Sequence, residues 1–151
     1  MLTLGIDDAG RGPLIGPMIL AGVLVDKSQE AKLKKANVRD SKTVFQEERN
    51  KLAKLIKENS LSSHVTKAFP NEIDNSLKGG TNLNTLEAIK AAEIINTINS
   101  GKFAKEKIKV ILDCPSINTT SWLNTLLTFV KHKDNLQFIC EHKADVNHVS
   151  V

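Results

Sequence analysis

The chain has 151 residues, 40% hydrophobic and 25% charged, which suits one domain with a real core and the composition of an ordinary soluble globular protein. No run of eighteen apolar residues occurs, and the N-terminus lacks an export-signal pattern, so we expect a cytoplasmic protein without membrane spans, spanning residues 1–151 as one domain. The net charge of +4 permits a polyanionic partner, whereas five Phe, one Trp and no Tyr argue against a single-strand binder built on base stacking.

The first half of the chain shows the pattern of three strands and two helices. Apolar residues alternate with small or polar ones over residues 2–7, which predicts a strand that ends in two acids. The apolar run at 18–25 predicts a buried strand that pairs antiparallel with the first, after a turn at Gly10-Arg11-Gly12-Pro13. Two helices and a third strand are predicted over residues 29–35, 47–58 and 61–68.

The second half alternates between helices and strands. A helix is predicted over residues 82–99, and the run 107–113 predicts a buried strand ending in a carboxylate. Thr119 or Thr120 is expected to cap the next helix, and a last strand follows over 135–141. The order of elements predicts an α/β fold, a mixed five-stranded sheet flanked by helices.

Acidic residues follow three of the predicted strands: Asp7 and Asp8 the first, Asp113 the fourth and Asp145 the fifth. If these strands are parallel neighbours, about 4.8 Å apart, their terminal carboxylates converge at one edge of the sheet. Oxygen ligands of this kind suit Mg²⁺ or Mn²⁺ rather than Zn²⁺, and a pair of such ions serves phosphodiester hydrolysis. A purely structural interpretation also fits any single one of them, because Asp often caps backbone amides at strand ends.

The glycine-rich turn after the acidic pair allows two interpretations. Strict alternation sends Asp7 and Asp8 to opposite faces of the sheet, so a bend at Gly10 and Gly12 is needed for both to reach one site. The turn either lets the backbone approach a ligand, with Arg11 available for a phosphate, or simply joins two strands.

Taken together, these segments resemble type 2 ribonuclease H (ribonuclease HII), in particular its archaeal branch. The stretch from Gly5 to Pro13, followed by Ile15-Gly16-Pro17-Met18, is similar to the specific opening signature of that family. The other matching motifs are Asp40-Ser41-Lys42, Asn82-Leu83-Asn84, Leu112-Asp113-Cys114-Pro115 and Glu141-His142-Lys143-Ala144-Asp145.

The resemblance implies the ribonuclease H fold and an endonuclease that hydrolyses RNA in RNA–DNA hybrids. It also implies cleavage 5′ to single ribonucleotides embedded in duplex DNA, with 5′-phosphate products and a role in DNA replication and repair. Four acids, Asp7, Asp8, Asp113 and Asp145, would hold two Mg²⁺ or Mn²⁺ ions. We expect a monomer whose partner is the duplex and not a membrane.

The resemblance also implies substrate-binding residues. The backbone groups of Gly10, Arg11 and Gly12 would face the 2′-hydroxyl, which distinguishes RNA from DNA. Ser41 and Lys42 would face backbone phosphates, which position the duplex without reading its sequence. Apart from the resemblance, Lys143 is a further candidate for a phosphate contact, because it lies two residues before Asp145.

Two departures from the family pattern are visible. Asp8 stands where the family has Glu, which shortens the side chain by one methylene. The chain also stops a few residues after Asp145, whereas family members continue with further helices and a tyrosine, so we expect a C-terminally truncated piece. Two alternatives remain open: a weak or inactive fragment that only binds nucleic acid, and a metal-dependent hydrolase of small phosphoesters.

Overall fold

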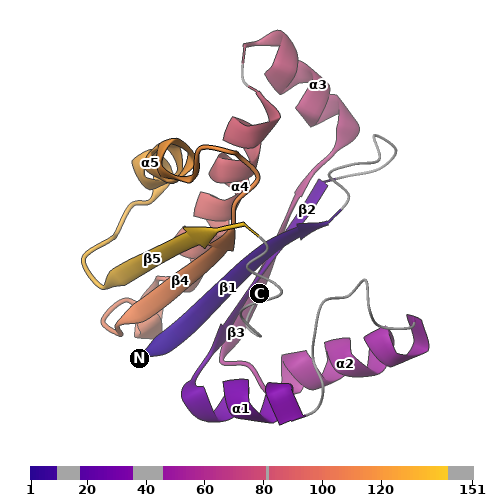
Figure 1. Cartoon of the computed structure of the whole chain (residues 1–151), viewed down its shortest axis with the longest axis vertical. Coiled ribbons are helices and arrows are strands. Elements are labelled where there is room, and N and C mark those ends of the chain that lie inside the picture. The colour runs from indigo at the N-terminus through magenta and orange to yellow at the C-terminus, as the bar shows by residue number, and fades with distance from the viewer. Residues whose placement is uncertain (10–17, 36–45, 81, 143–151) are drawn as a thin grey trace.

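A computed structural model describes residues 1–9, 18–35, 46–80 and 82–142, and these residues form a five-stranded mixed sheet flanked by helices (Figure 1). The strands are β1 (Leu2–Ala9), β2 (Met18–Val25), β3 (Ser62–Ala68), β4 (Ile108–Asp113) and β5 (Leu136–Glu141). Their spatial order is β3-β2-β1-β4-β5. The pairings of β1 with β2 and of β2 with β3 are antiparallel, whereas β1, β4 and β5 are parallel neighbours. The mixed sheet predicted from the sequence is therefore confirmed, and β1, β4 and β5 meet the condition under which the terminal acids were expected to converge.

In the described part of the chain, five α-helices lie around the sheet. They are α1 (Lys27–Lys35), α2 (Gln46–Glu58), α3 (Pro70–Lys78), α4 (Leu83–Ile98) and α5 (Thr119–Phe129), with a short 3₁₀ turn, η2, at Gly101–Phe103. Figure 1 shows α4 behind the sheet, α5 at the upper left above β5, α1 and α2 at the lower end and α3 at the top. None of the helices in the described ranges is long and apolar enough to cross a membrane.

The main core lies between the sheet and the helices α4 and α5. Because successive side chains of a strand point to opposite faces, alternate residues such as Leu4 and Ile6 of β1 face these helices and are buried. Gly22 of β2 lets α4 approach closely, since a Cβ atom there would lie 2.4 Å from Cγ2 of Ile94. The close contact fixes the height of α4 above β1 and β2.

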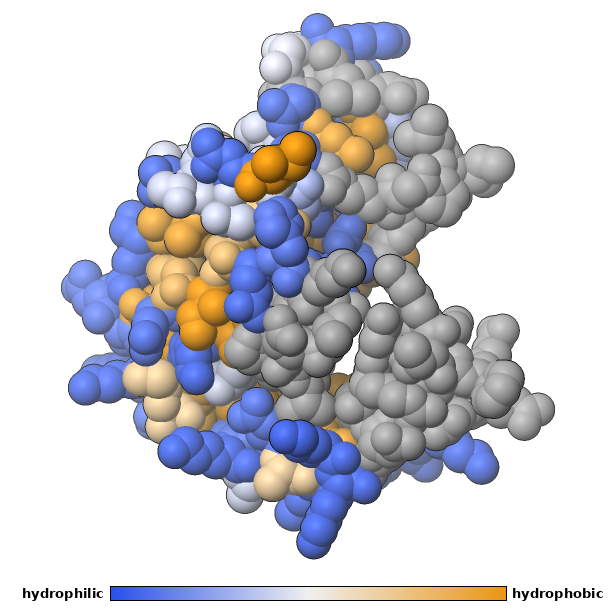
Figure 2. Space-filling model, viewed as in Figure 1, coloured by the Kyte–Doolittle hydropathy of each residue, from blue (hydrophilic) through white to orange (hydrophobic). Residues whose placement is uncertain are grey.

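The strand β5 is less well covered than its neighbour β4. Its residues are half-buried except for the exposed Gln137. In the view of Figure 2, apolar side chains gather over the left half, where β4 and β5 lie in Figure 1, between hydrophilic side chains at the rim.

Two details of the fold differ from the sequence-based prediction. The helix α3 was not predicted, and an ion pair of 2.7 Å between Glu72 and Lys90 joins it to α4. The N-cap of α5 is Asn118, one residue before the predicted Thr119, because the Asn118 side chain accepts the backbone N–H of Ser121 at 3.0 Å. An amide oxygen reaches that N–H as well as a threonine hydroxyl does, so the sequence alone did not separate the two.

Candidate metal centre

Three of the four predicted acidic ligands lie in the described residues, and the fold brings all three together. One carboxylate oxygen of each of Asp7, Asp8 and Asp113 lies within 4.8 Å of the corresponding oxygens of the other two. All three residues are half-buried, so the group is open to solvent on one side. The convergence predicted from strand ends is confirmed for these three residues.

The parallel pairing of β1 with β4 explains how Asp7 and Asp113 meet. The last paired residues of this ladder are Ile6 and Leu112, and each acid is the next residue on its strand. The two carboxylates therefore stand at the same level on neighbouring strands, on the same face of the sheet. The hydrophobic residues before them anchor both strands, so backbone pairing fixes the spacing of the acids.

Asp8 reaches the same point although it belongs to the opposite face. It pairs with Leu20 in a β1–β2 ladder that continues to Ala9. The backbone N–H of Asp8 donates to Oδ1 of Asp7 at 2.8 Å, so the Asp7 carboxylate is turned towards the backbone of the following residue. The paired residues of β1 and β4 end at Ile6 and Leu112, so the three acids lie at the end of this ladder.

The donor set fits a hard divalent cation. Two oxygens on opposite sides of a Mg²⁺ ion, each about 2.1 Å from it, are separated by about 4.2 Å. The spacing of at most 4.8 Å among the three oxygens is close to this value. Ionised carboxylates at such a separation repel each other by about 3 kcal/mol per pair at an effective dielectric constant near 20. A cation between them removes this penalty, and oxygen-only ligands favour Mg²⁺ or Mn²⁺ over Zn²⁺.

The surroundings of Asp113 contain a further acid and two thiols. Glu141 of β5 is the register partner of Asp113, and its carbonyl oxygen accepts the backbone N–H of Cys114 at 2.9 Å. Burial, followed by the neighbouring Cys114 and Asp113, raises the pKa of the Cys140 thiol well above its ordinary value. Both cysteines are free, and Cys140 stays a protonated thiol at neutral pH, which makes it a poor metal ligand.

The remaining predicted site residues lie outside the described part of the chain. They are the fourth acid, Asp145, and the substrate-binding residues Gly10, Arg11, Gly12, Ser41, Lys42 and Lys143.

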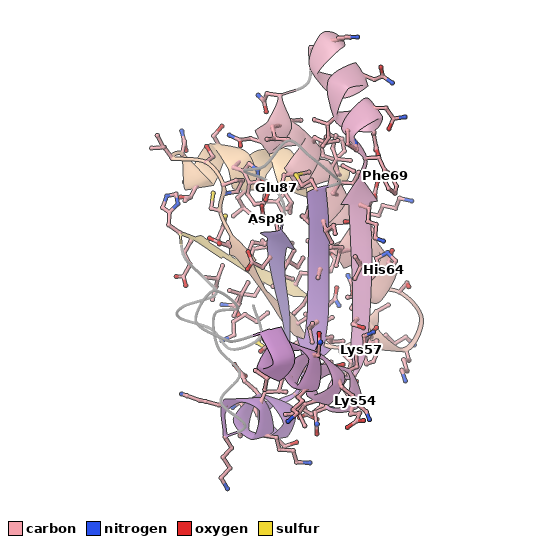
Figure 3. The ribbon with its side chains drawn as sticks, turned by 90° about the vertical axis from the view of Figure 1, so that its right-hand side faces the viewer. Asp8, Lys54, Lys57, His64, Phe69 and Glu87 are labelled. Atoms are coloured by element: carbon pink, nitrogen blue, oxygen red, sulfur yellow. The ribbon has the colours of Figure 1, made fainter. Side chains whose placement is uncertain are left out.

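One buried acid of α4 was not singled out from the sequence. Glu87, in the first turns of α4, is only 3% exposed. Figure 3 shows Glu87 and Asp8 at the same end of the sheet. Its spacing along the sequence could have revealed it. Glu87 precedes Ala91 by four residues and so lies on the side of α4 that faces the core, where an apolar residue is expected.

Comparison with known proteins gives the same family throughout. A family model described as Ribonuclease HII matches residues 4–151. The ribonuclease HII of Methanocaldococcus jannaschii is 32% identical over 154 residues, which cover 98% of this chain and 66% of that protein.

Two solved structures are similar to this chain in three dimensions as well as in sequence. The ribonuclease H2 of Pyrococcus horikoshii OT3 has a TM-score of 0.84 at 28% identity, over 100% of this chain and 67% of that one. The ribonuclease HII of Archaeoglobus fulgidus, solved in complex with PCNA, has a TM-score of 0.83 at 28% identity, with the same coverage. The chain thus spans about two thirds of the length of these relatives. With its strand order, its carboxylate cluster and a family match over nearly all of its length, the chain belongs to the ribonuclease HII family and has the ribonuclease H-like fold.

Proposed function

We propose that this chain hydrolyses the RNA strand of RNA–DNA hybrids, including the bond 5′ to a single ribonucleotide embedded in duplex DNA. The observation that carries the proposal is the convergence of Asp7, Asp8 and Asp113 at the carboxyl ends of β1 and β4. Family membership supports the substrate class, and the carboxylate cluster supports hydrolysis at a phosphodiester.

The three converging acids, together with Asp145, would hold two divalent cations, Mg²⁺ or Mn²⁺. Such cations, when bound, favour ionisation of the attacking water and offset the negative charge that develops on the leaving oxygen. The chain contributes the geometry: β1 and β4 hold Asp7 and Asp113 side by side through paired backbone, before any substrate arrives. A preformed site of this kind avoids the cost of reorganising charged groups during the reaction.

In the proposed reaction the water oxygen bonds to phosphorus while the bond from phosphorus to the 3′ oxygen breaks. One product strand ends in a 3′-hydroxyl, which takes up a proton, and the other begins with a 5′-phosphate. Gly10, Arg11 and Gly12 are proposed to contact the 2′-hydroxyl of the ribonucleotide, and Ser41, Lys42 and Lys143 the backbone phosphates. The chain is proposed to act on the duplex as a monomer.

A nicking assay on the chain itself tests this proposal. A labelled duplex with one ribonucleotide is incubated with the chain and Mg²⁺, Mn²⁺ or EDTA, and the position of the nick is read against size markers. We expect metal-dependent nicking 5′ to the ribonucleotide and no nicking of an all-DNA duplex of the same sequence.

Two variants separate the acidic site from general charge effects. We expect Asp113→Asn to lower nicking at least about 100-fold, because changes even outside the ligand sphere of metal sites cost 10–100-fold. Asp134→Asn removes an exposed acid from the turn before β5, at the opposite end of that strand, and is expected to leave nicking unchanged. Retention of the duplex without nicking favours the binding-only alternative, and hydrolysis of a small phosphoester alone favours the phosphohydrolase. Either result overturns the proposal.

A further inference from the structure

The helix α4 carries a buried acid in line with its apolar contacts to the sheet. Its inward residues include Ala91, Ile94 and Ile98, which are at most 3% exposed. Glu87 lies one turn before Ala91 on the same side and is equally buried. Glutamate is seldom buried to this degree, because removing a carboxylate from water is costly. A carboxylate in this place therefore calls for a reason beyond packing.

Two contacts fix the position of α4 along the sheet. Ile94 lies against Gly22, which is the register partner of Ile6 in β1. One turn earlier, the carbonyl oxygen of Lys90 accepts a hydrogen bond from Oγ1 of Thr66 at 3.4 Å. Going from Ile94 towards the start of α4 therefore leads towards the end of the sheet that carries the acids.

Strand pairing relates the level of the second contact, between Thr66 and Lys90, to Asp8. Thr66 of β3 pairs with Leu20 of β2, and Leu20 pairs with Asp8 of β1. Lys90 thus marks the level of Asp8 on α4. Glu87 lies three residues before Lys90, about 4.5 Å further along the helix axis, which places it just beyond that level.

The alternation of β1 decides which acid Glu87 faces. Asp8 is two residues after Ile6, and Ile6 points into the core beneath α4. Asp8 therefore points to the α4 side of the sheet, whereas Asp7 belongs to the other side. Figure 3 agrees, since Glu87 and Asp8 lie at the same end of the sheet.

We propose that Glu87 is a positioning residue of the metal centre, facing Asp8 from α4 and strengthening cation binding through its buried negative charge. Screening by salt is weak for a buried charge, so the carboxylate attracts a cation held by Asp8 without being its ligand. This inference rests on the proposed cation site.

Binding of Mn²⁺ alone, without nucleic acid, provides the test. The affinity is measured by calorimetric titration of the full chain and by the electron paramagnetic resonance signal of free Mn²⁺. We expect Glu87→Gln to weaken binding about 10–100-fold, the range observed for residues outside the ligand sphere of metal sites. Glu87→Asp keeps the charge and is expected to retain most of the affinity. The matched control is Glu93→Gln, which removes an exposed acid on the same helix.

A second readout separates positioning from a structural role. Unfolding is followed without metal for each variant, and nicking is measured over a range of Mn²⁺ concentrations. For Glu87→Gln we expect the half-saturating Mn²⁺ concentration to rise while turnover at saturating Mn²⁺ recovers to within a few-fold of the wild type. An unchanged Mn²⁺ affinity in Glu87→Gln overturns the inference, as does an equal loss in Glu93→Gln.

Failure of the inference differs from failure of the proposed function. If the wild-type chain itself binds no Mn²⁺, the metal centre is refuted and Glu87 with it. If Glu87→Gln does not fold, Glu87→Met fills a similar volume without a charge and takes its place in the titration. Should both uncharged variants fail to fold while Glu87→Asp folds, the carboxylate serves the fold and the positioning role is refuted.

Discussion

Adding one methyl group at Gly22 is expected to push α4 away from the sheet. The Cβ atom of an alanine there would lie 2.4 Å from Cγ2 of Ile94, whereas carbon atoms in contact are normally about 3.5–4.0 Å apart. Ile94 is fully buried and β-branched, so its side chain has little freedom to turn aside. The helix or the strand therefore has to move by roughly 1 Å to restore a normal contact.

Two opposing effects set the size of this change. Replacing glycine by alanine inside a strand is intrinsically favourable by about 0.5–1 kcal/mol. Overpacking a closed core costs about 1–3 kcal/mol. The contact of 2.4 Å is severe, so we expect the cost to dominate and Gly22→Ala to lose about 2 kcal/mol of unfolding free energy. Mn²⁺ binding is expected to weaken as well, because the displaced α4 carries Glu87 away from Asp8.

The assay is urea unfolding followed by the fluorescence of Trp122, the single and buried tryptophan of the chain. Ala21→Ser, which adds one atom at an exposed position of the same strand, serves as the control. Ile94→Ala alone is expected to cost about 2–5 kcal/mol, and in that background Gly22→Ala is expected to become nearly neutral. A Gly22→Ala variant as stable as the wild type, or strictly additive costs in the double variant, would refute this reasoning.

Three further changes test the site and the helix caps. Asp8→Glu restores the longer acid of the family and is expected to raise Mg²⁺-supported nicking; equal or lower turnover contradicts this. Asp26 and Gln29 cap α1 reciprocally, with hydrogen bonds of 2.8 and 3.0 Å. The backbone N–H of Gln29, followed by the Ser28 hydroxyl, donates to the Asp26 carboxylate and lowers its pKa below its ordinary 3.8. The wild type is therefore expected to be more stable than Asp26→Ala by the full amount at neutral pH, and this difference should shrink as the pH falls through that lowered pKa. Urea unfolding at several pH values measures the difference, and a difference that does not change with pH contradicts the prediction. Asn118→Ala is expected to lower the free energy of unfolding by about 1 kcal/mol in the same assay. A larger loss of stability in Thr119→Ala would show that Thr119, and not Asn118, caps α5.

Much of the metal centre was predictable because it depends on the ends of strands. Hydrophobic runs mark β1 and β4, and the acid after each run is visible in the sequence. Parallel strands end at the same edge of a sheet, so a correct prediction of their pairing also placed Asp7 beside Asp113. For Asp8, alternation along the strand pointed away from the site. The sequence offered only a bend at Gly10 and Gly12, residues outside the described part of the chain, as a way to bring it back.

The helix α3 was not predicted because the local sequence pattern does not indicate a helix there. The segment from Pro70 to Lys78 is short and rich in Asn, Asp and Ser, which are weak helix formers, although Pro70 suits a first helical position. Its support comes from elsewhere in the chain, through the ion pair of Glu72 with Lys90 and the packing of Ile73 against the core. Contacts of this kind have no local signal.

By itself, the sequence determined the order of the strands along the chain, the α/β class and the acids at the ends of β1 and β4, because hydrophobic period and strand ends are local properties. Only the tertiary structure decided that Asp8 joins Asp7 and Asp113, since alternation along β1 by itself sends Asp7 and Asp8 to opposite faces of the sheet. It also decided that Glu87 is buried and lies at the same end of the sheet as Asp8, because the close contact of α4 with Gly22 sets the position of the helix. Both depend on how backbone segments distant in sequence approach each other, and no single segment encodes that distance.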